Sequence, residues 1–258
     1  MIRKVIAFDL DGTLAPSKSP LPDRIGELLD QLLDRYHVCV ISGGKFGQFE
    51  KQLLNNLKAD SMRLERLHIM PTCGTRYMRF NSGSGAWEKI YAEDFTPAQK
   101  KKIAEVLGKV AKELGFVESK IYGDILEDRG SQISWSAFGQ DIVDVLGEEG
   151  LRRKEAWDPD NAKKNQLRNV AAELLPEFEV RVGGLTTIDV TRPGIDKAYG
   201  MRKLMEMLQI GKEAILFIGD RLQEGGNDYP VKAMGIDTLE ISDWRETAIA
   251  IAAIVATA

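Results

Sequence analysis

The sequence is poor in the residues that mark several protein classes. Among its 258 residues are two cysteines, Cys39 and Cys73, and two histidines, and the cysteines form no CxxC pair. These counts argue against a disulfide-rich secreted scaffold and against a Cys/His metal centre. The N-terminal segment meets Asp9 before a signal region could form, and no apolar run reaches the ~20 residues of a membrane span. We expect a cytoplasmic protein with no membrane partner.

An excess of positive charge is also missing. Lysine and arginine number 35 against 39 acidic residues, which gives a net charge of −4 and makes nucleic acid a poor candidate partner. The hydrophobic fraction of 43% is that of a chain with a packed core rather than a disordered one. The length predicts one large domain or two modest ones.

Both ends of the chain predict alternating strands and helices. Apolar β-rich runs at residues 4–8 and 38–41 enclose apolar residues at helical spacing, preceded by Pro22 and Asp23. Near the other end, residues 214–218 and 237–241 predict strands, and residues 196–208 and 244 onward predict helices. This α/β pattern indicates a Rossmann-like parallel sheet.

The middle of the chain lacks that alternation. Residues 76–80 and 88–91 flank a turn-rich stretch and predict a hairpin, residues 103–114 predict a helix, and 131–137, 178–182 and 185–190 predict strands. We therefore expect an α+β cap domain at 84–186, inserted into an α/β core formed by 1–83 and 187–258.

Acidic residues follow two of the predicted parallel strands. Asp9 and Asp11 leave the first strand in a DLDGT sequence, and Asp220 and Asp228 follow the strand at 214–218 in GD and GGND sequences. Ligands of open α/β sheets bind at the carboxyl ends of the strands. Hard carboxylate oxygens gathered there predict a Mg²⁺ site.

These sequences, with SGG after the second strand and a lysine before the final strands, resemble the haloacid dehalogenase superfamily of Mg²⁺-dependent phosphotransferases. The resemblance implies that Asp9 is the nucleophile that forms an aspartyl phosphate, and that Asp11 is the general acid and then the base. It also implies a catalytic role for Lys197 beside the transferred phosphoryl group.

The same resemblance assigns the ligands of the phosphate and of the metal. The Ser42 hydroxyl, with Gly43 and Gly44, would bind the phosphoryl oxygens. The implied Mg²⁺ ligands are a side-chain oxygen of Asp9, the backbone carbonyl of Asp11 and the side chain of Asp220, and Asp228 is expected to support them.

Within the superfamily the insert resembles the Cof-type branch, and the pattern is closest to the eukaryotic-type phosphomannomutases. Matching stretches include Ala15-Pro16, the SGG segment and its FEK continuation, and the long GD-to-GGND segment. The resemblance implies that a phosphorylated sugar is the substrate and allows a homodimer formed through the cap. The positions implied to bind substrate are Lys18, Arg129, Thr187, Asp189 and Asn227.

The departures from that family concern the second phosphate. Gln140 and Gly147 stand where the family pattern has cap arginines, and a neutral amide cannot replace a bidentate guanidinium. We therefore favour a phosphatase over a phosphomannomutase-like mutase, which is the alternative. A non-catalytic binder of phosphorylated ligands is a remote third reading. His37 and His68 lie beside predicted strands without metal-ligand spacing, which favours structural roles.

Overall fold

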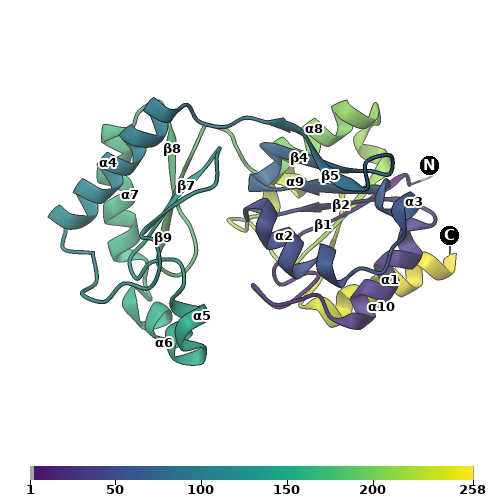
Figure 1. Ribbon diagram of the computed structural model, residues 1–258, viewed down its shortest axis with the longest axis horizontal. Helices are drawn as coiled ribbons and strands as arrows, with labels where there is room; N and C mark the ends of the chain where they lie inside the picture. The colour runs from purple at the N-terminus through teal and green to yellow at the C-terminus, as the bar shows by residue number, and fades with distance from the viewer. Residues whose placement is uncertain (1–2, 258) are drawn as a thin grey trace. The chain divides into compact units, whose positions relative to one another are not determined.

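The computed structural model describes residues 3–257, and the chain divides into two compact units (Figure 1). The larger unit combines the residues up to Ala92 with those from Ile195 onward, and the inserted unit is Glu93–Gly194. No helix within the described range is long and apolar enough to span a membrane.

The larger unit is built on a mixed sheet that has seven strands among the described residues, in the order β11-β10-β1-β2-β3-β4-β5. Five strands are parallel: β1 (Val5–Phe8), β2 (His37–Ile41), β3 (Leu67–Met70), β10 (Ile215–Gly219) and β11 (Asp237–Glu240). The hairpin strands β4 (Arg76–Asn81) and β5 (Ala86–Ala92) continue the sheet antiparallel. The expected parallel α/β sheet is thus confirmed, with an antiparallel edge.

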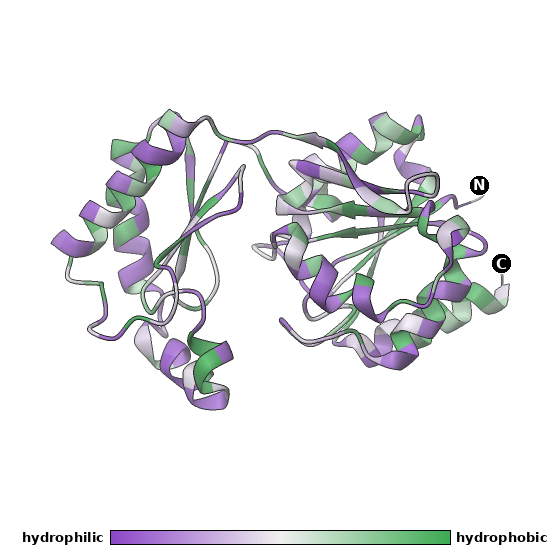
Figure 2. Cartoon of the chain, viewed as in Figure 1, coloured by the Kyte–Doolittle hydropathy of each residue, from purple (hydrophilic) through white to green (hydrophobic). Residues whose placement is uncertain are grey.

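Helices cover both faces of this sheet. They are α1 (Asp23–Leu33), α2 (Phe46–Gln52), α3 (Ser61–Leu64), α8 (Lys197–Leu208), α9 (Tyr229–Ala233) and α10 (Trp244–Thr257), with short 3-10 turns at Leu54–Asn56, Thr72–Gly74 and Lys212–Ala214. Ile6 and Phe8 of β1 belong to the core shared with α1 and α10, whereas Val5 and Ala7 belong to the core shared with α8. A strand buried on both faces reads as an uninterrupted apolar run, as Figure 2 shows along β1 and β2.

The inserted unit is an antiparallel sheet with four helices among its described residues, two of which pack against the sheet. The sheet order is β6-β7-β9-β8, formed by β6 (Leu126–Asp128), β7 (Ile133–Ser136), β9 (Thr187–Thr191) and β8 (Glu179–Val182). The helices are α4 (Pro97–Glu113), α5 (Ile142–Leu146), α6 (Glu148–Trp157) and α7 (Ala162–Leu174). Ile133, Trp135, Ile188 and Val190 form one core with residues of α4 and α7, so the alternate strand residues face away from these helices.

The division of the chain differs from the expected boundaries at 83/84 and 186/187. The turn-rich segment at 81–85 is a hairpin loop, since β5 pairs with β4 along its length in the larger sheet. At the other boundary, β9 pairs with both β7 and β8, which makes it a central strand of the inserted sheet. The structure therefore divides the chain at 92/93 and 194/195. Strand pairing sets these boundaries, and local composition does not reveal it.

Candidate active site

Four charged side chains meet at the carboxyl edge of the larger sheet. Asp9 follows β1, Asp220 follows β10, Asp228 precedes α9 and Lys197 opens α8. The Lys197 Nζ donates to Asp9 Oδ1 at 2.5 Å and to Asp228 Oδ1 at 2.6 Å. The exposed fractions of Asp9, Lys197 and Asp228 are 3%, 1% and 0%, so water screens this cluster very little.

The sheet register brings these residues together. Phe8 pairs with Ile218 across parallel β1 and β10, and the Asp9 N–H donates to the Ile218 carbonyl at 3.1 Å. Lys197 is the first residue of α8. The Asp196 carboxylate fixes that helix end by accepting a hydrogen bond from the Tyr199 N–H at 2.8 Å. The pairing of β1 with β10 and the capped start of α8 therefore fix the backbone from which these side chains project.

Burial and like charge set the protonation behaviour of the cluster. Burial raises the pKa of Asp9 to about 7 against the opposing effect of the Lys197 ammonium, and the charge of Asp228 adds to the rise. Burial disfavours charge on Lys197, but the carboxylates of Asp9 and Asp228 outweigh it and raise the pKa of Lys197. Burial and then Asp228 also raise the pKa of Asp220. The three carboxylates face the ammonium of Lys197 and the more exposed guanidinium of Arg221, whose Nε lies 3.7 Å from Asp220 Oδ2. With all three ionised, the cluster keeps negative charge that a cation would offset.

The carboxylates fit a divalent metal ion. Asp9, Asp220 and Asp228 each offer an oxygen, and the three atoms lie within 4.8 Å of one another, a hard-oxygen donor set of the type that Mg²⁺ prefers. The loop after β1 approaches Asp220 closely, since a Cβ at Gly12 (φ 89°) would lie 2.5 Å from Asp220 Oδ2. Only glycine suits that position.

The predicted phosphate-binding segment follows β2 directly. Ser42 is 6% exposed, and its hydroxyl accepts from the Gly44 N–H at 3.3 Å. The Ser42 carbonyl accepts from the Cys73 N–H at 2.9 Å, which anchors the segment to the neighbouring loop. Asn227 directly precedes Asp228, whose Oδ2 accepts from the Arg221 N–H at 3.1 Å.

The Asp11 side chain is bound by helix α2 and by its own loop. Its Oδ1 accepts from the Lys18 N–H at 2.7 Å and from Gln52 Nε2 at 3.1 Å, and its Oδ2 accepts from Gln48 Nε2 at 2.7 Å. Neither glutamine was predicted from the sequence. The signal that could have found them is their i, i+4 spacing in the helix that begins just after SGG. At Lys18 it is the backbone that makes the contact, in a left-handed conformation with φ 56°.

The three predicted substrate positions of the inserted unit lie on or beside its sheet. Asp189 pairs with Ser134 across β9 and β7 and accepts from its hydroxyl at 2.6 Å. Thr187 lies two residues earlier on the same face of β9. Beyond the end of β6, the Arg129 Nε donates to Glu127 Oε2 at 2.7 Å.

The two positions that depart from the phosphomannomutase pattern carry no charge here. The Gln140 Nε2 donates to the Ser134 carbonyl at 3.4 Å, and Gly147 joins α5 to α6 with φ 57°. On β8 of the same unit, the guanidinium of Arg181 pairs with the carboxylate of Glu179 at 2.6 Å.

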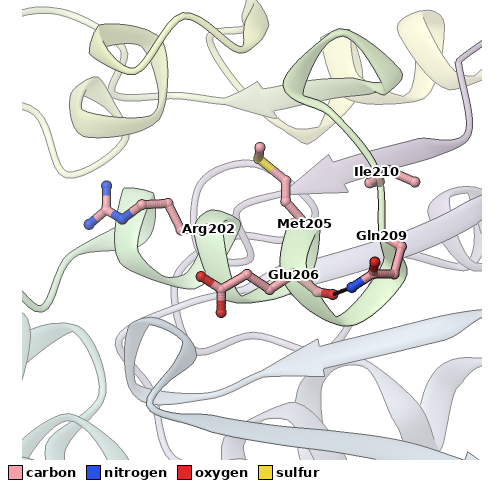
Figure 3. A pocket seen from close by; sticks show the side chains of 5 residues that line it. All are labelled: Arg202, Met205, Glu206, Gln209 and Ile210. Carbon is pink, nitrogen blue, oxygen red and sulfur yellow. Dashed lines mark hydrogen bonds between the residues drawn. The ribbon is translucent and has the colours of Figure 1, made fainter.

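A surface pocket on α8 lies apart from these residues. It is lined by Arg202, Met205, Glu206, Gln209 and Ile210 (Figure 3). The one hydrogen bond drawn there joins the Gln209 amide to the Glu206 carbonyl at 2.9 Å. No residue of the charged cluster lines this pocket, so it is not the candidate site.

Comparison with known proteins defines the family. The sequence model of the haloacid dehalogenase-like hydrolases matches residues 6–230, and the chain belongs to this family. The phosphomannomutase of Encephalitozoon cuniculi is 25% identical over 244 aligned residues, covering 89% of this chain and 84% of that protein. The spinach phosphomannomutase (Spinacia oleracea) is 26% identical over 238 residues, covering 89% and 86%.

Solved structures share the fold. A haloacid dehalogenase-like hydrolase from Bacteroides thetaiotaomicron superposes with a TM-score of 0.62 at 17% identity, covering 98% of this chain and 99% of that one. An IMP-nucleotidase of Plasmodium falciparum, solved with IMP bound, gives a TM-score of 0.67 at 17% identity and covers 99% of this chain and 68% of that one. These likenesses confirm the predicted core fold.

Proposed function

We propose that this hydrolase is a Mg²⁺-dependent phosphatase that cleaves a phosphorylated sugar or sugar derivative through an aspartyl phosphate. The observation that supports the proposal most directly is the buried cluster of Lys197 with Asp9 and Asp228, beside Asp220. A carboxylate nucleophile needs positive charge beside it when it approaches an anionic phosphoryl group.

In the proposed first step, a carboxylate oxygen of Asp9 attacks phosphorus while the bond to the sugar oxygen breaks. Asp11 donates its proton to the departing alkoxide and thereby becomes a carboxylate. Lys197 offsets the charge of the phosphoryl group, and the Ser42 hydroxyl with the N–H groups of Gly43 and Gly44 would bind its oxygens. Mg²⁺, held by Asp9, Asp220 and the Asp11 carbonyl with support from Asp228, would supply further positive charge.

In the second step, Asp11 takes a proton from water as the water oxygen attacks phosphorus. The bond to Asp9 breaks, inorganic phosphate forms and Asp9 returns as a carboxylate. Asp11 thus acts as acid and then as base, which returns the enzyme to its starting state after each turnover.

The inserted unit is proposed to select the sugar. Thr187 and Asp189 would contact sugar hydroxyls, and Arg129, Lys18 and Asn227 complete the proposed substrate positions. The neutral Gln140 and Gly147, and the pairing of Arg181 with Glu179, favour a substrate with a single phosphate. A mutase must hold a bisphosphorylated sugar in two orientations, which calls for charge-assisted contacts to the second phosphate.

A phosphomannomutase-like mutase is the second candidate. The similarity to the phosphomannomutases of Encephalitozoon cuniculi and spinach, each over 89% of this chain, supports this reading. The two candidates share the first step and differ in whether the phosphoenzyme reacts with water or with a sugar hydroxyl.

Phosphorus NMR distinguishes the candidates. The protein is incubated with Mg²⁺ and mannose 1-phosphate, with a trace of mannose 1,6-bisphosphate, and then with other sugar monophosphates. We expect inorganic phosphate as the only product, and no product with EDTA or with Asp9→Asn. Mannose 6-phosphate without phosphate release would establish the mutase. If Asp9→Asn kept more than a few per cent of the turnover, the covalent mechanism would be wrong. Binding without turnover by the wild type would indicate a binding protein.

A further inference from the structure

We infer that Gln48 and Gln52 of α2 are positioning residues that orient Asp11 for proton transfer. This inference rests on the proposed function, in which Asp11 protonates the leaving group. Asp11 lies two residues after Asp9 in the loop that follows β1. Its carboxylate oxygens accept hydrogen bonds from side chains of α2, whereas the ammonium of Lys197 donates to Asp9.

Both oxygens of Asp11 have amide donors. Gln48 Nε2 donates to Oδ2 at 2.7 Å, and Gln52 Nε2 donates to Oδ1 at 3.1 Å. The Lys18 N–H adds a third donor to Oδ1 at 2.7 Å. With donors on each oxygen, rotation of the carboxylate about its bond to Cβ is opposed from both sides.

The two glutamines also hold each other and the loop that follows Asp11. Gln48 Nε2 donates to Gln52 Oε1 at 2.6 Å, and Gln52 Nε2 donates to the Ser19 carbonyl at 2.9 Å. The Gln52 carbonyl accepts from the Leu21 N–H at 2.8 Å. Gln52 is 3% exposed, and buried side-chain polar atoms of this kind are nearly always hydrogen-bonded.

The segment before α2 leaves room for this arrangement. A Cβ at Gly44 would lie 2.1 Å from Gln48 Oε1, so the absence of a side chain there lets Gln48 reach Asp11. The i, i+4 spacing then places Gln52 on the same face of the helix. Glu50 and Lys51, in the same helix, are exposed and offer matched controls.

The role predicts a dependence on the leaving group. Asp11 transfers its proton to the ester oxygen as that oxygen separates from phosphorus, so a poorly oriented Asp11 slows the release of an alkoxide. A p-nitrophenolate leaves as a stable anion and does not need this proton. Loss of the glutamines should therefore slow alkyl phosphates more than aryl phosphates.

The experiment measures kcat/KM for mannose 6-phosphate and p-nitrophenyl phosphate, because kcat/KM reports the formation of the phosphoenzyme. We expect Gln48→Leu and Gln52→Leu to lower the value for mannose 6-phosphate about 10- to 100-fold, within the range of general acid catalysis, and the value for p-nitrophenyl phosphate less than about threefold. Lys51→Leu should change neither, and Gln48→His, which keeps an N–H donor, should recover part of the loss.

Equal losses on both substrates, or no loss, would overturn the inference. Gln48 is only partly buried, so Gln48→Leu serves if Gln52→Leu does not fold. A crystal structure of Gln48→Leu gives a readout without turnover: an Asp11 carboxylate in its original orientation would also overturn the inference. Failure of the wild type to form a phosphoenzyme would count against the proposed function instead.

Discussion

The two units of the molecule arrange their charged side chains differently. At the carboxyl edge of the larger sheet, Asp9, Asp228 and Lys197 are buried, and carboxylates outnumber the ammonium. In the inserted unit, Arg129 pairs with Glu127 and Arg181 pairs with Glu179, and these side chains keep partial access to solvent. The inserted unit also buries Asp158 and Lys164, but among the described residues only the larger unit brings three carboxylates within 4.8 Å of one another, and phosphoryl transfer is proposed there.

This difference has an energetic meaning. Burial of a charge without full compensation costs several kcal/mol, so such a cluster lowers the stability of the fold. The ion pairs of the inserted unit carry less of this cost, because each charge has an opposite charge beside it and keeps some contact with water. This contrast supports the proposal that the cluster in the larger unit takes part in phosphoryl transfer.

Removal of the ammonium should have the largest effect. In Lys197→Met the carboxylates of Asp9 and Asp228 lose their shared cation, and we expect kcat to fall about 10²- to 10³-fold, as for the loss of a comparable electrostatic contact. The measurement is steady-state release of phosphate. Arg202→Met, at an exposed position on the same helix, is the control and should keep normal kcat. Near-normal kcat in Lys197→Met would show that the buried cluster of the larger unit is not needed for catalysis.

A change in the inserted unit should affect recognition instead. In Asp189→Asn an ionised acceptor is lost, and charged hydrogen bonds contribute about 1.5–3 kcal/mol. We therefore expect kcat/KM for the best sugar phosphate to fall about 10- to 100-fold, with p-nitrophenyl phosphate little changed. Asp144→Asn, exposed on α5, should match the wild type. Equal losses on both substrates would assign Asp189 to chemistry or folding rather than to recognition.

The smallest expected effect concerns the amino-terminal ends of β2 and β3, on the side of the sheet away from the acidic cluster. There the imidazole of His68 is buried in its neutral form. His68 Nδ1 shares a hydrogen bond with the Tyr77 hydroxyl at 2.6 Å, and His68 Nε2 shares one with His37 Nδ1 at 2.9 Å. Burial, and then the charge of Arg79 and the neighbouring His37, hold the pKa of His68 well below 6.5. The unfolded chain therefore binds more protons below pH 6.5, so stability rises with pH through this range.

The free energy of unfolding should accordingly be lower at pH 5.5 than at pH 7.5, by up to about 1.4 kcal/mol from His68. Urea denaturation of the wild type and of His68→Asn at both pH values tests this contribution. The variant is expected to be less stable at pH 7.5 but to lose less stability between the two values. If His68→Asn kept the pH dependence of the wild type, protonation of His68 would not be the cause of that dependence.

Local patterns were enough for much of the core. The apolar runs predicted β1, β2 and β10 because strands buried on both faces leave continuous hydrophobic sequence. Pro22 and Asp23 predicted the start of α1, and the structure confirms that the helix begins at Asp23. Asp9 and Asp220 could be expected to meet because parallel strands end at one edge of their sheet. The catalytic roles of these residues stay predictions.

Other features required the folded chain. The sequence by itself determined many of the strands and helices and which residue types could perform phosphoryl transfer, since these depend on local propensity and periodicity. It did not predict β3, β6 or α2. Only the tertiary structure decided that β5 joins the larger sheet and β9 the inserted one, and that Lys197 bonds Asp9 from 188 positions away in the chain. Likewise, only the fold brings Gln48 and Gln52 to Asp11. Contacts of this range depend on strand pairing and helix packing, which no local sequence window contains.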